Sequence, residues 1–482
     1  MDGRKDREFR SSATDWARTE FGHAELGNAK RTKRIVQMAT RMTQHPSGQI
    51  TQMFPESAER QGAFGAIENP RIDPDCLNDA STRAAIRRTD GYRRVFVPID
   101  RTSLRFSSSP APDLGDIGKV GRFVSKGLEC HHAVVVAPDG QCLGVGDQVY
   151  FRRKFRETPL TREQRRALPI DEKETRYWLE CVRSMEAAFD SERPDIDRCY
   201  ILDRGADFNE MLSYADACSQ QIIIRSASNR RLDEDDYNYL EDGLASASIV
   251  GRYSLKIPAR AGRPARTATM QIRARKCGIL LEDRVQQTKE CVWLWVVDTR
   301  EVSRVPPGTQ PLKWRLLTNR PVETLAAAVQ LVDDYTHRWA IEVMHRCWKT
   351  VCGVETTRLR SAENIIRFAT LMASVAARIE HLKHASRAEP EAPASKLFSQ
   401  AELKSIKLLR FKPVDEPAGE PTSKQAVQWV AEIGGHTGPH NGLPGSETIS
   451  RGMLRVESGV IVLEHLGWTH DPPWPPPEKT DQ

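Results

Sequence analysis

Three acidic residues, far apart in the chain, have the type and setting that two-metal chemistry requires. Asp100 follows the apolar run 94–99, Asp203 follows the run 199–202, and Glu342 lies in a segment with helical spacing. A carboxylate at the end of a buried strand reaches the rim of a sheet, where acids from separate elements can share a pair of Mg²⁺ ions. Such a pair suits displacement at phosphorus. Taken alone, each aspartate is more often the start of an ordinary turn.

The segment around Glu342 adds further polar groups. At about 100° per residue, Tyr335, Arg338, Glu342 and Lys349 fall on one face of a continuous helix, within roughly 60° of one another. A phenol, a guanidinium, a carboxylate and an ammonium aligned in this way suit a site that binds metal and phosphate together. The alternative is a solvated ion-pair face, because Arg338 and Glu342 are four residues apart. On the residues alone, that alternative is favoured.

The distribution of charge says more than its total of +6. No acidic residue lies between Glu25 and Glu56, whereas the same stretch contains several basic residues: Lys30, Arg31, Lys33, Arg34 and Arg41. A local field of this sign attracts phosphate backbones. A solvated helix face is an equally good interpretation of the charge alone.

Other sequence features exclude whole classes of protein. The ten cysteines contain no C-x-x-C pair, which argues against a zinc site and a disulfide framework. The motif 130–132, Cys-His-His, has no further ligand at metal spacing, and a strand that begins at His132 is the favoured interpretation. There is no secretory signal, no apolar stretch of membrane-spanning length, and no nucleotide-binding glycine motif. We therefore expect an intracellular protein without a membrane or nucleotide partner.

The order of the expected elements indicates an α/β core. Three antiparallel strands precede a helix, a strand, a helix and a strand, which is the order of a ribonuclease H-like fold. The expected spans are 94–100, 132–137, 142–151, 172–189 (helix), 199–203, 208–217 (helix) and 221–225.

The remaining sequence divides around this core. We expect an N-terminal helical DNA-binding domain over residues 1–80 and a catalytic domain over 81–385, with a β-rich insertion over 226–319. Residues 386–482 are expected to form a C-terminal helical domain with a Pro-rich, disordered tail. That domain is expected to serve dimerisation.

The spacing Tyr335-x₂-Arg338-x₃-Glu342-x₆-Lys349 resembles the signature of the insertion-sequence-four family of DDE transposases. The resemblance runs through nearly the whole chain, in order, although Gly205 stands where the family pattern has an acidic residue. The motif at 335–349 is specific, and the matches near the two ends of the chain are weaker. The other matching segments are 15–17, 24–34, 100–104, 203–207, 263–266, 312–314, 428–429 and 433–435.

The resemblance implies a role for each candidate residue. Asp100, Asp203 and Glu342 would be catalytic and would hold two Mg²⁺ ions, for which Mn²⁺ can substitute. Tyr335, Arg338 and Lys349 would grip phosphates of the cleaved strand. Trp314 would stack on a flipped base, with a strand-core aromatic as its alternative, and the terminal inverted repeat would be contacted by Lys30, Arg31 and Arg34. His345 and Arg346, beside this face, could touch DNA or simply lie on the surface.

The expected function is cut-and-paste transposition of double-stranded DNA, with hairpin formation at the transposon end and strand transfer into target DNA. A homodimer would bridge two ends through the region after Ala401, in the bacterial cytoplasm at the nucleoid. The alternatives are a non-catalytic DNA-binding inhibitor or domesticated regulator and a stand-alone nuclease or resolvase. A sugar hydrolase with paired carboxylates is least supported, because the basic N-terminal segment would then have no purpose.

Overall fold

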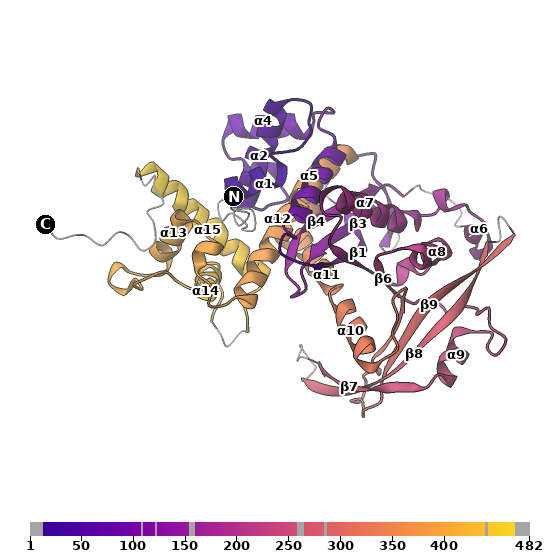
Figure 1. Cartoon of the computed structure of the whole chain (residues 1–482). Coiled ribbons are helices and arrows are strands. Elements are labelled where there is room, and N and C mark those ends of the chain that lie inside the picture. The colour runs from indigo at the N-terminus through magenta and orange to yellow at the C-terminus, as the bar shows by residue number, and fades with distance from the viewer. Residues whose placement is uncertain are drawn as a thin grey trace.

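The computed structural model describes residues 13–467 except 108, 121–122, 154–159, 258–264, 284–286 and 439–441. The N-terminal helices and a C-terminal helical unit lie toward one end of the molecule, and the long β8–β9 hairpin of the sheet reaches away from both (Figure 1). Expected elements that fall on the other residues, including the Pro-rich tail beyond 467, lie outside the described part.

The N-terminal helices pack around one apolar stripe. They are α1 (Ala13–Phe21), α2 (Ala29–Gln44), α3 (Ile50–Met53) and α4 (Ser57–Ile67). The side chain of Asn28 accepts a hydrogen bond from the Lys30 backbone N–H at the start of α2, which satisfies one of the free donors of the first turn. Ile35, Met38 and Ala39 of α2 are buried, so the opposite, basic face is left to solvent.

Helix α5 (Pro74–Arg87) links these helices to the sheet. Asp73 caps it and Pro74 occupies its first position, an arrangement that favours helix initiation. Its residues pack against α1 on one side and against the strand β4 on the other. The expected domain boundary at residue 80 therefore falls inside a helix that belongs to both parts.

The described strands form one mixed, ten-stranded sheet in the order β2-β3-β1-β5-β6-β10-β9-β8-β7, with β4 on β3. β1, β5 and β6 are parallel, and the other neighbours are antiparallel. The strand bounds are β1 Arg94–Arg105, β2 Gly115–Val120, β3 Phe123–Val136, β4 Cys142–Phe151, β5 Asp197–Leu202, β6 Gln221–Arg225, β7 Ile249–Ile257, β8 Arg266–Asp283, β9 Thr288–Glu301 and β10 Lys313–Thr318.

Helices cover both faces of the sheet, which explains why its central strands are apolar on both sides. Buried residues of α7, α8 and α9 form one cluster with Val95, Val97 and Ile99 of β1. Residues of α10, α11 and α12 form the other with Phe96 and Leu104. The helix bounds are α6 Arg162–Arg166, α7 Arg176–Glu192, α8 Asn209–Ala217, α9 Leu240–Ser246, α10 Leu325–Thr336, α11 Trp339–Arg346 and α12 Ala362–Ala388.

Short helical turns connect several of these elements. A π-helical turn, η3, continues directly from α11. Their bounds are η1 Ile170–Glu172, η2 Arg204–Ala206, η3 Cys347–Val351, η4 Val354–Thr356, η5 Ala394–Lys396 and η6 Pro413–Asp415.

Strand β1 is longer than expected. The sequence predicts a strand that ends at Asp100, but β1 continues to Arg105 because its pairing with β3 extends to the pair Arg105 and Gly127. Only the parallel pairing with β5 stops before Asp100. The change from apolar to polar residues thus marks the loss of one neighbour and not the end of the strand.

The β-rich segment 226–319 continues the same sheet. Its strand β10 pairs with β6, and β9, β8 and β7 follow outward. The segment therefore extends the edge of the core sheet, although residues 258–264 and 284–286 lie outside the described part.

The C-terminal unit consists of α13 (Gln400–Arg410), α14 (Ser423–Ile433) and α15 (Ser446–His465), which share an apolar cluster with the end of α12. The expected boundary at 385/386 falls in the last turn of α12. In the described part of the chain, no helix combines the length and the apolar character that crossing a membrane requires.

Buried charges join the N-terminal helices, α12 and the C-terminal unit. Glu20 of α1 pairs with Arg88, and Arg378 of α12 faces both Glu402 of α13 and Glu457 of α15. All five side chains are buried. We call these five residues the domain junction.

Candidate active site

Two aspartates come level at one edge of the sheet. Because β1 and β5 run parallel with Ile99 opposite Leu202, the next residues along, Asp100 and Asp203, lie side by side. The carboxylate of Asp100 accepts a hydrogen bond from the Arg101 backbone N–H at 2.8 Å. That of Asp203 caps η2 by accepting from the Gly205 N–H at 2.6 Å.

Glu342 reaches the same edge from α11. The sequence pattern predicts one continuous helix over 335–349, but α10 ends at Thr336 and α11 begins after Arg338. Arg338 therefore stands at the start of a new helix, where its guanidinium spans two acids. One of its N–H groups donates to Asp100 Oδ2 at 2.9 Å, and another donates to Glu342 Oε1.

We call Asp100, Asp203 and Glu342 the carboxylate triad. Negative charge is in excess in this group. Burial and the neighbouring charge of Asp203 raise the pKa of Asp100 to about 7, against the opposing effects of Arg338 and the Arg101 N–H. One guanidinium thus offsets the repulsion among three acids only in part. Asp203 is half-buried and the Glu342 side chain is 30% exposed, so the triad opens toward solvent.

The donor set suits a hard divalent cation. Carboxylate oxygens are the protein ligands that Mg²⁺ prefers, and it keeps several of its waters. Within the described residues, no group of three or more His, Cys, Asp or Glu side chains is close enough to surround one ion. The contacts are instead pairwise, with Asp100 beside Asp203 and joined through Arg338 to Glu342.

The other two residues of the spaced motif are less exposed than expected. Tyr335 is 7% exposed, with its hydroxyl buried near Arg225 and Arg338. Lys349 is half-buried and donates through Nζ to the Ser103 carbonyl at 2.7 Å, and burial lowers the pKa of its ammonium group. Lys349 is thereby held beside β1, two residues beyond Arg101.

Trp314 lies at the same edge of the sheet. It precedes Leu316, whose register partner is Arg225 at the end of β6, so it projects past that strand on the side of Asp203. Its indole is half-buried and packs against the small apolar cluster that contains Ile257 and Met270.

The basic residues of α2 divide into two kinds. Lys30 and Arg34 are exposed. Arg31 is half-buried and turns back to donate to the Leu26 carbonyl at 2.7 Å, so it stabilises the loop before α2. The pattern of charges along a helix cannot separate these two cases, because the distinction depends on a carbonyl that the preceding turn supplies.

The histidines near the site are buried. His131 and His132 alternate across β3: His131 packs against Tyr177 and Trp178, and His132 packs against His345 and Trp348. Facing opposite sides, the two cannot share an ion. The sequence pattern predicts a strand that begins at His132, whereas β3 already begins at Phe123.

His345 was expected on the DNA-facing or free surface, and that expectation is wrong. It is 7% exposed because its ring turns toward β3. Arg346, the next residue, is exposed.

Several contacts and exposed groups around the triad were not predicted from the sequence. Trp339 is 44% exposed on α11, one turn from Glu342 and two turns from Arg346; helical spacing could have revealed this face. Gly205 lies against Trp178, because a β-carbon there would be 2.9 Å from the indole. No local signal predicts that contact. Asp207 is fully buried in an ion pair with Arg230 and anchors the segment that follows β6.

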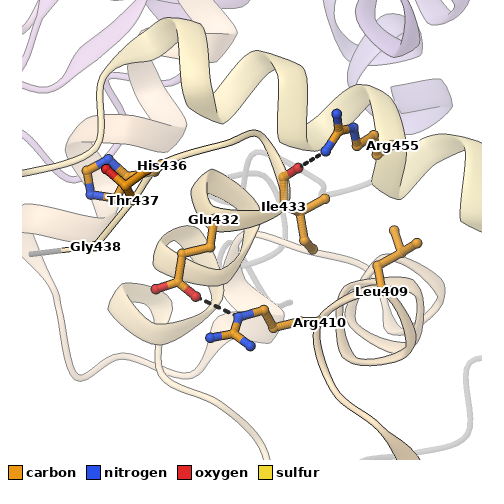
Figure 2. A pocket seen from close by; sticks show the side chains of 8 residues that line it. All are labelled: Leu409, Arg410, Glu432, Ile433, His436, Thr437, Gly438 and Arg455. Carbon is orange, nitrogen blue, oxygen red and sulfur yellow. Dashed lines mark hydrogen bonds and ion pairs between the residues drawn. The ribbon is translucent and has the colours of Figure 1, made fainter.

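An open cavity of about 610 Å³ lies far from the triad, among the C-terminal helices α13, α14 and α15 (Figure 2). Its charged groups are already engaged. Arg410 pairs with Glu432 at 2.6 Å, and Arg455 donates to the Ile433 carbonyl. The cavity therefore offers no counterpart to the triad.

Known families match two parts of the chain. Residues 13–72 match the transposase DNA-binding family, and residues 151–377 match the transposase DDE domain, a span that includes Asp203 and Glu342 but starts beyond Asp100. A cryo-EM structure of the piggyBac transposase synaptic complex with hairpin DNA is loosely similar, with a TM-score of 0.37 and 9% identity over 79% of this chain and 77% of that chain. These matches show a transposase DNA-binding domain followed by a transposase DDE domain in this chain.

Proposed function

We propose that the protein is a cut-and-paste DNA transposase in which Asp100, Asp203 and Glu342 hold two divalent ions. The observation that carries this proposal is the convergence of the three acids, through the register of β1 with β5 and the two ion pairs of Arg338. The raised pKa of Asp100 supports it, because a cation would relieve the repulsion that favours protonation.

The ions, Mg²⁺ or Mn²⁺, would activate the attacking oxygen and stabilise the leaving oxygen when bound. Water first nicks one strand at the transposon end, and the freed 3′-hydroxyl attacks the opposite strand to form a hairpin. A second water opens the hairpin, and the 3′-hydroxyl then attacks target DNA. Each step is an in-line displacement at phosphorus, so one set of carboxylates serves all four.

Arg338 has two roles in this scheme. Without DNA its guanidinium forms ion pairs with both Asp100 and Glu342. With DNA present it turns to a phosphate of the cleaved strand, which frees both carboxylates for metal. Lys349, held at Ser103, provides a second phosphate contact. The buried Tyr335 lies near Arg338 and helps to position its guanidinium. Trp314, at the same edge, is proposed to stack on the base that hairpin formation expels, since an unstacked base needs an aromatic face.

Double-stranded DNA is the proposed substrate, bound through the exposed face of α2. Lys30 and Arg34 are exposed there, whereas Arg31 stabilises the preceding loop. Replacing Lys30 or Arg34 by Ala is expected to weaken end binding and to reduce the salt dependence of binding by about one charge each. Arg31→Ala should leave that slope unchanged and lower the melting temperature instead.

We further propose that the protein is a member of the insertion-sequence-four family. It would have a ribonuclease H-like core and form a homodimer that bridges two transposon ends. The spaced residues Tyr335, Arg338, Glu342 and Lys349 support the family assignment. The mixed sheet with β1, β5 and β6 in parallel supports the core. Dimerisation through the C-terminal unit is open to a direct test by light scattering in the presence of end DNA.

A labelled duplex tests the proposal. Short inverted repeats that flank the gene supply its end sequence, and the full chain is incubated with it and Mg²⁺. We expect a nick at the transposon end, followed by a hairpin and joined target product. Binding without any nick would instead favour a non-catalytic DNA-binding regulator, and nicking without hairpins or joining would favour a stand-alone nuclease.

A further inference from the structure

A buried pair of imidazoles lies directly behind the carboxylate triad. His132 is the register partner of Asp100 across the β1–β3 ladder. His345 lies one helical turn after Glu342 on α11. The Nδ1 atom of His132 and the Nε2 atom of His345 are 3.1 Å apart, and the two residues are 0% and 7% exposed. The residue paired with Asp100 on the next strand therefore contacts the residue one helical turn after Glu342.

The contact is a hydrogen bond between neutral rings. Burial, together with the nearby charge of Lys349, lowers the pKa of His132 to about 3, and burial lowers that of His345 well below its usual value. Tyr150 donates its hydroxyl proton to Gln148 at 3.0 Å, which leaves its oxygen to accept from His132 Nε2 at 3.5 Å. In the tautomers assigned from this network, His345 Nε2 donates and His132 Nδ1 accepts.

This bond differs in kind from the other contacts of α11. Ile341 and Met344 hold the helix against the sheet through apolar packing, which is not directional. Arg338 joins Asp100 to Glu342 directly, but in the proposed function it leaves both acids to bind phosphate. The imidazole pair is buried and would not have to break when Arg338 turns to phosphate.

We propose that His132 and His345 are positioning residues, whose hydrogen bond fixes α11 on β3 so that Glu342 and Asp100 keep the spacing that shared divalent ions require. The proposal rests on the proposed function. Neither histidine touches substrate or metal. Groups that orient metal ligands typically change metal affinity by 10- to 100-fold when they are removed.

Two replacements of His345 separate this role from a structural one. His345→Gln keeps an N–H donor at the position of Nε2, whereas His345→Asn is polar but too short to reach His132. Direct Mn²⁺ binding to the full chain with end DNA is measured by electron paramagnetic resonance, beside thermal unfolding and end binding. His384→Gln, a half-buried histidine of α12 outside the pair, is the matched control.

We expect His345→Asn to weaken Mn²⁺ binding by about 10- to 100-fold with end binding unchanged, and His345→Gln and His384→Gln to remain within about threefold of the wild type. His132→Leu, which removes the acceptor, should reproduce the His345→Asn result. Wild-type affinity in a folded His345→Asn protein would overturn the inference, as would equal losses in the Asn and Gln variants. If Mn²⁺ binding by the wild type does not depend on Asp100, the proposed function is overturned instead.

Discussion

Two clusters of carboxyl groups in this protein each contain an acid with a raised pKa, but they differ in solvent exposure and in the cations that face them. In the carboxylate triad, burial and Asp203 raise the pKa of Asp100 to about 7. At the domain junction, burial and Glu457 raise the pKa of Glu402 well above its usual value. The first cluster opens to solvent and carries one bridging guanidinium; the second is sealed.

Counting charges explains the difference. At the junction, Arg88 and Arg378 face Glu20 and the pair Glu402 and Glu457. This set is neutral when the pair of glutamates holds one proton, so the protein itself completes the balance. At the triad, three acids face the single positive charge of Arg338. The further positive charge that would balance them must come from outside the protein. A perturbed pKa thus marks a site for cations only where solvent reaches the acids.

The largest effect that the comparison predicts is the loss of chemistry when a triad acid is neutralised. Glu342→Gln should lower the single-turnover nicking rate by about 10³-fold or more, because it removes charge from where the metal binds. End binding, measured by mobility shift, should be unchanged. Glu447→Gln, an exposed acid of α15, is the control; substantial nicking by Glu342→Gln would remove this residue from the site.

Removing the buried arginine of the junction should affect stability and not chemistry. Arg378→Met leaves Glu402 and Glu457 without their facing cation, and breaking a buried ion pair in this way costs about 3–5 kcal/mol. Urea unfolding measures the loss. A destabilisation under about 1 kcal/mol would show that the junction does not depend on the charge balance described here.

The bridging arginine of the triad should behave in the opposite way. Arg338→Gln removes a cation that competes for Asp100 and Glu342, so Mn²⁺ affinity without DNA should rise. Nicking should nevertheless fall by about 10²-fold, because the phosphate contact is lost. Calorimetric Mn²⁺ titration and single-turnover kinetics give the two numbers. A fall in both would mean that Arg338 holds the acids in place and does not compete with metal.

The smallest effect concerns pH. Glu402 has a raised pKa in the folded state, so the unfolded chain ionises first, and stability falls as pH rises from about 4.5 through the folded-state pKa. Glu402→Gln should flatten this decline and stabilise the protein above neutral pH by roughly 1 kcal/mol or more. Thermal unfolding from pH 5 to 9 tests it, with Glu447→Gln as the control; an unchanged slope contradicts the assignment to Glu402.

Much of the fold could be predicted from local pattern. The bounds of β4 and β6 agree with the expected spans, because each is an apolar run between turn residues. The two aspartates that follow apolar runs were expected at one edge of the sheet. The structure places them side by side there, since parallel strands bring equivalent positions to one edge.

Features that depend on distant neighbours could not be predicted. The continuation of β1 past Asp100 depends on β3, and the break between α10 and α11 depends on packing that no Pro or Gly announces. Tyr335 and His345 carry polar atoms yet are buried. For His345, the partner that makes burial tolerable lies more than 200 residues away along the chain, and spacing within a helix contains no information about it.

Iron-mediated cleavage tests most directly whether the triad binds divalent ions. Fe²⁺ replaces Mg²⁺ in the full chain with end DNA, and ascorbate with peroxide then cuts the polypeptide near bound iron. We predict breaks close to residues 100, 203 and 342, suppressed by excess Mg²⁺ and weakened in Glu342→Gln. Breaks confined to other parts of the chain, or breaks that Mg²⁺ does not suppress, would contradict the account.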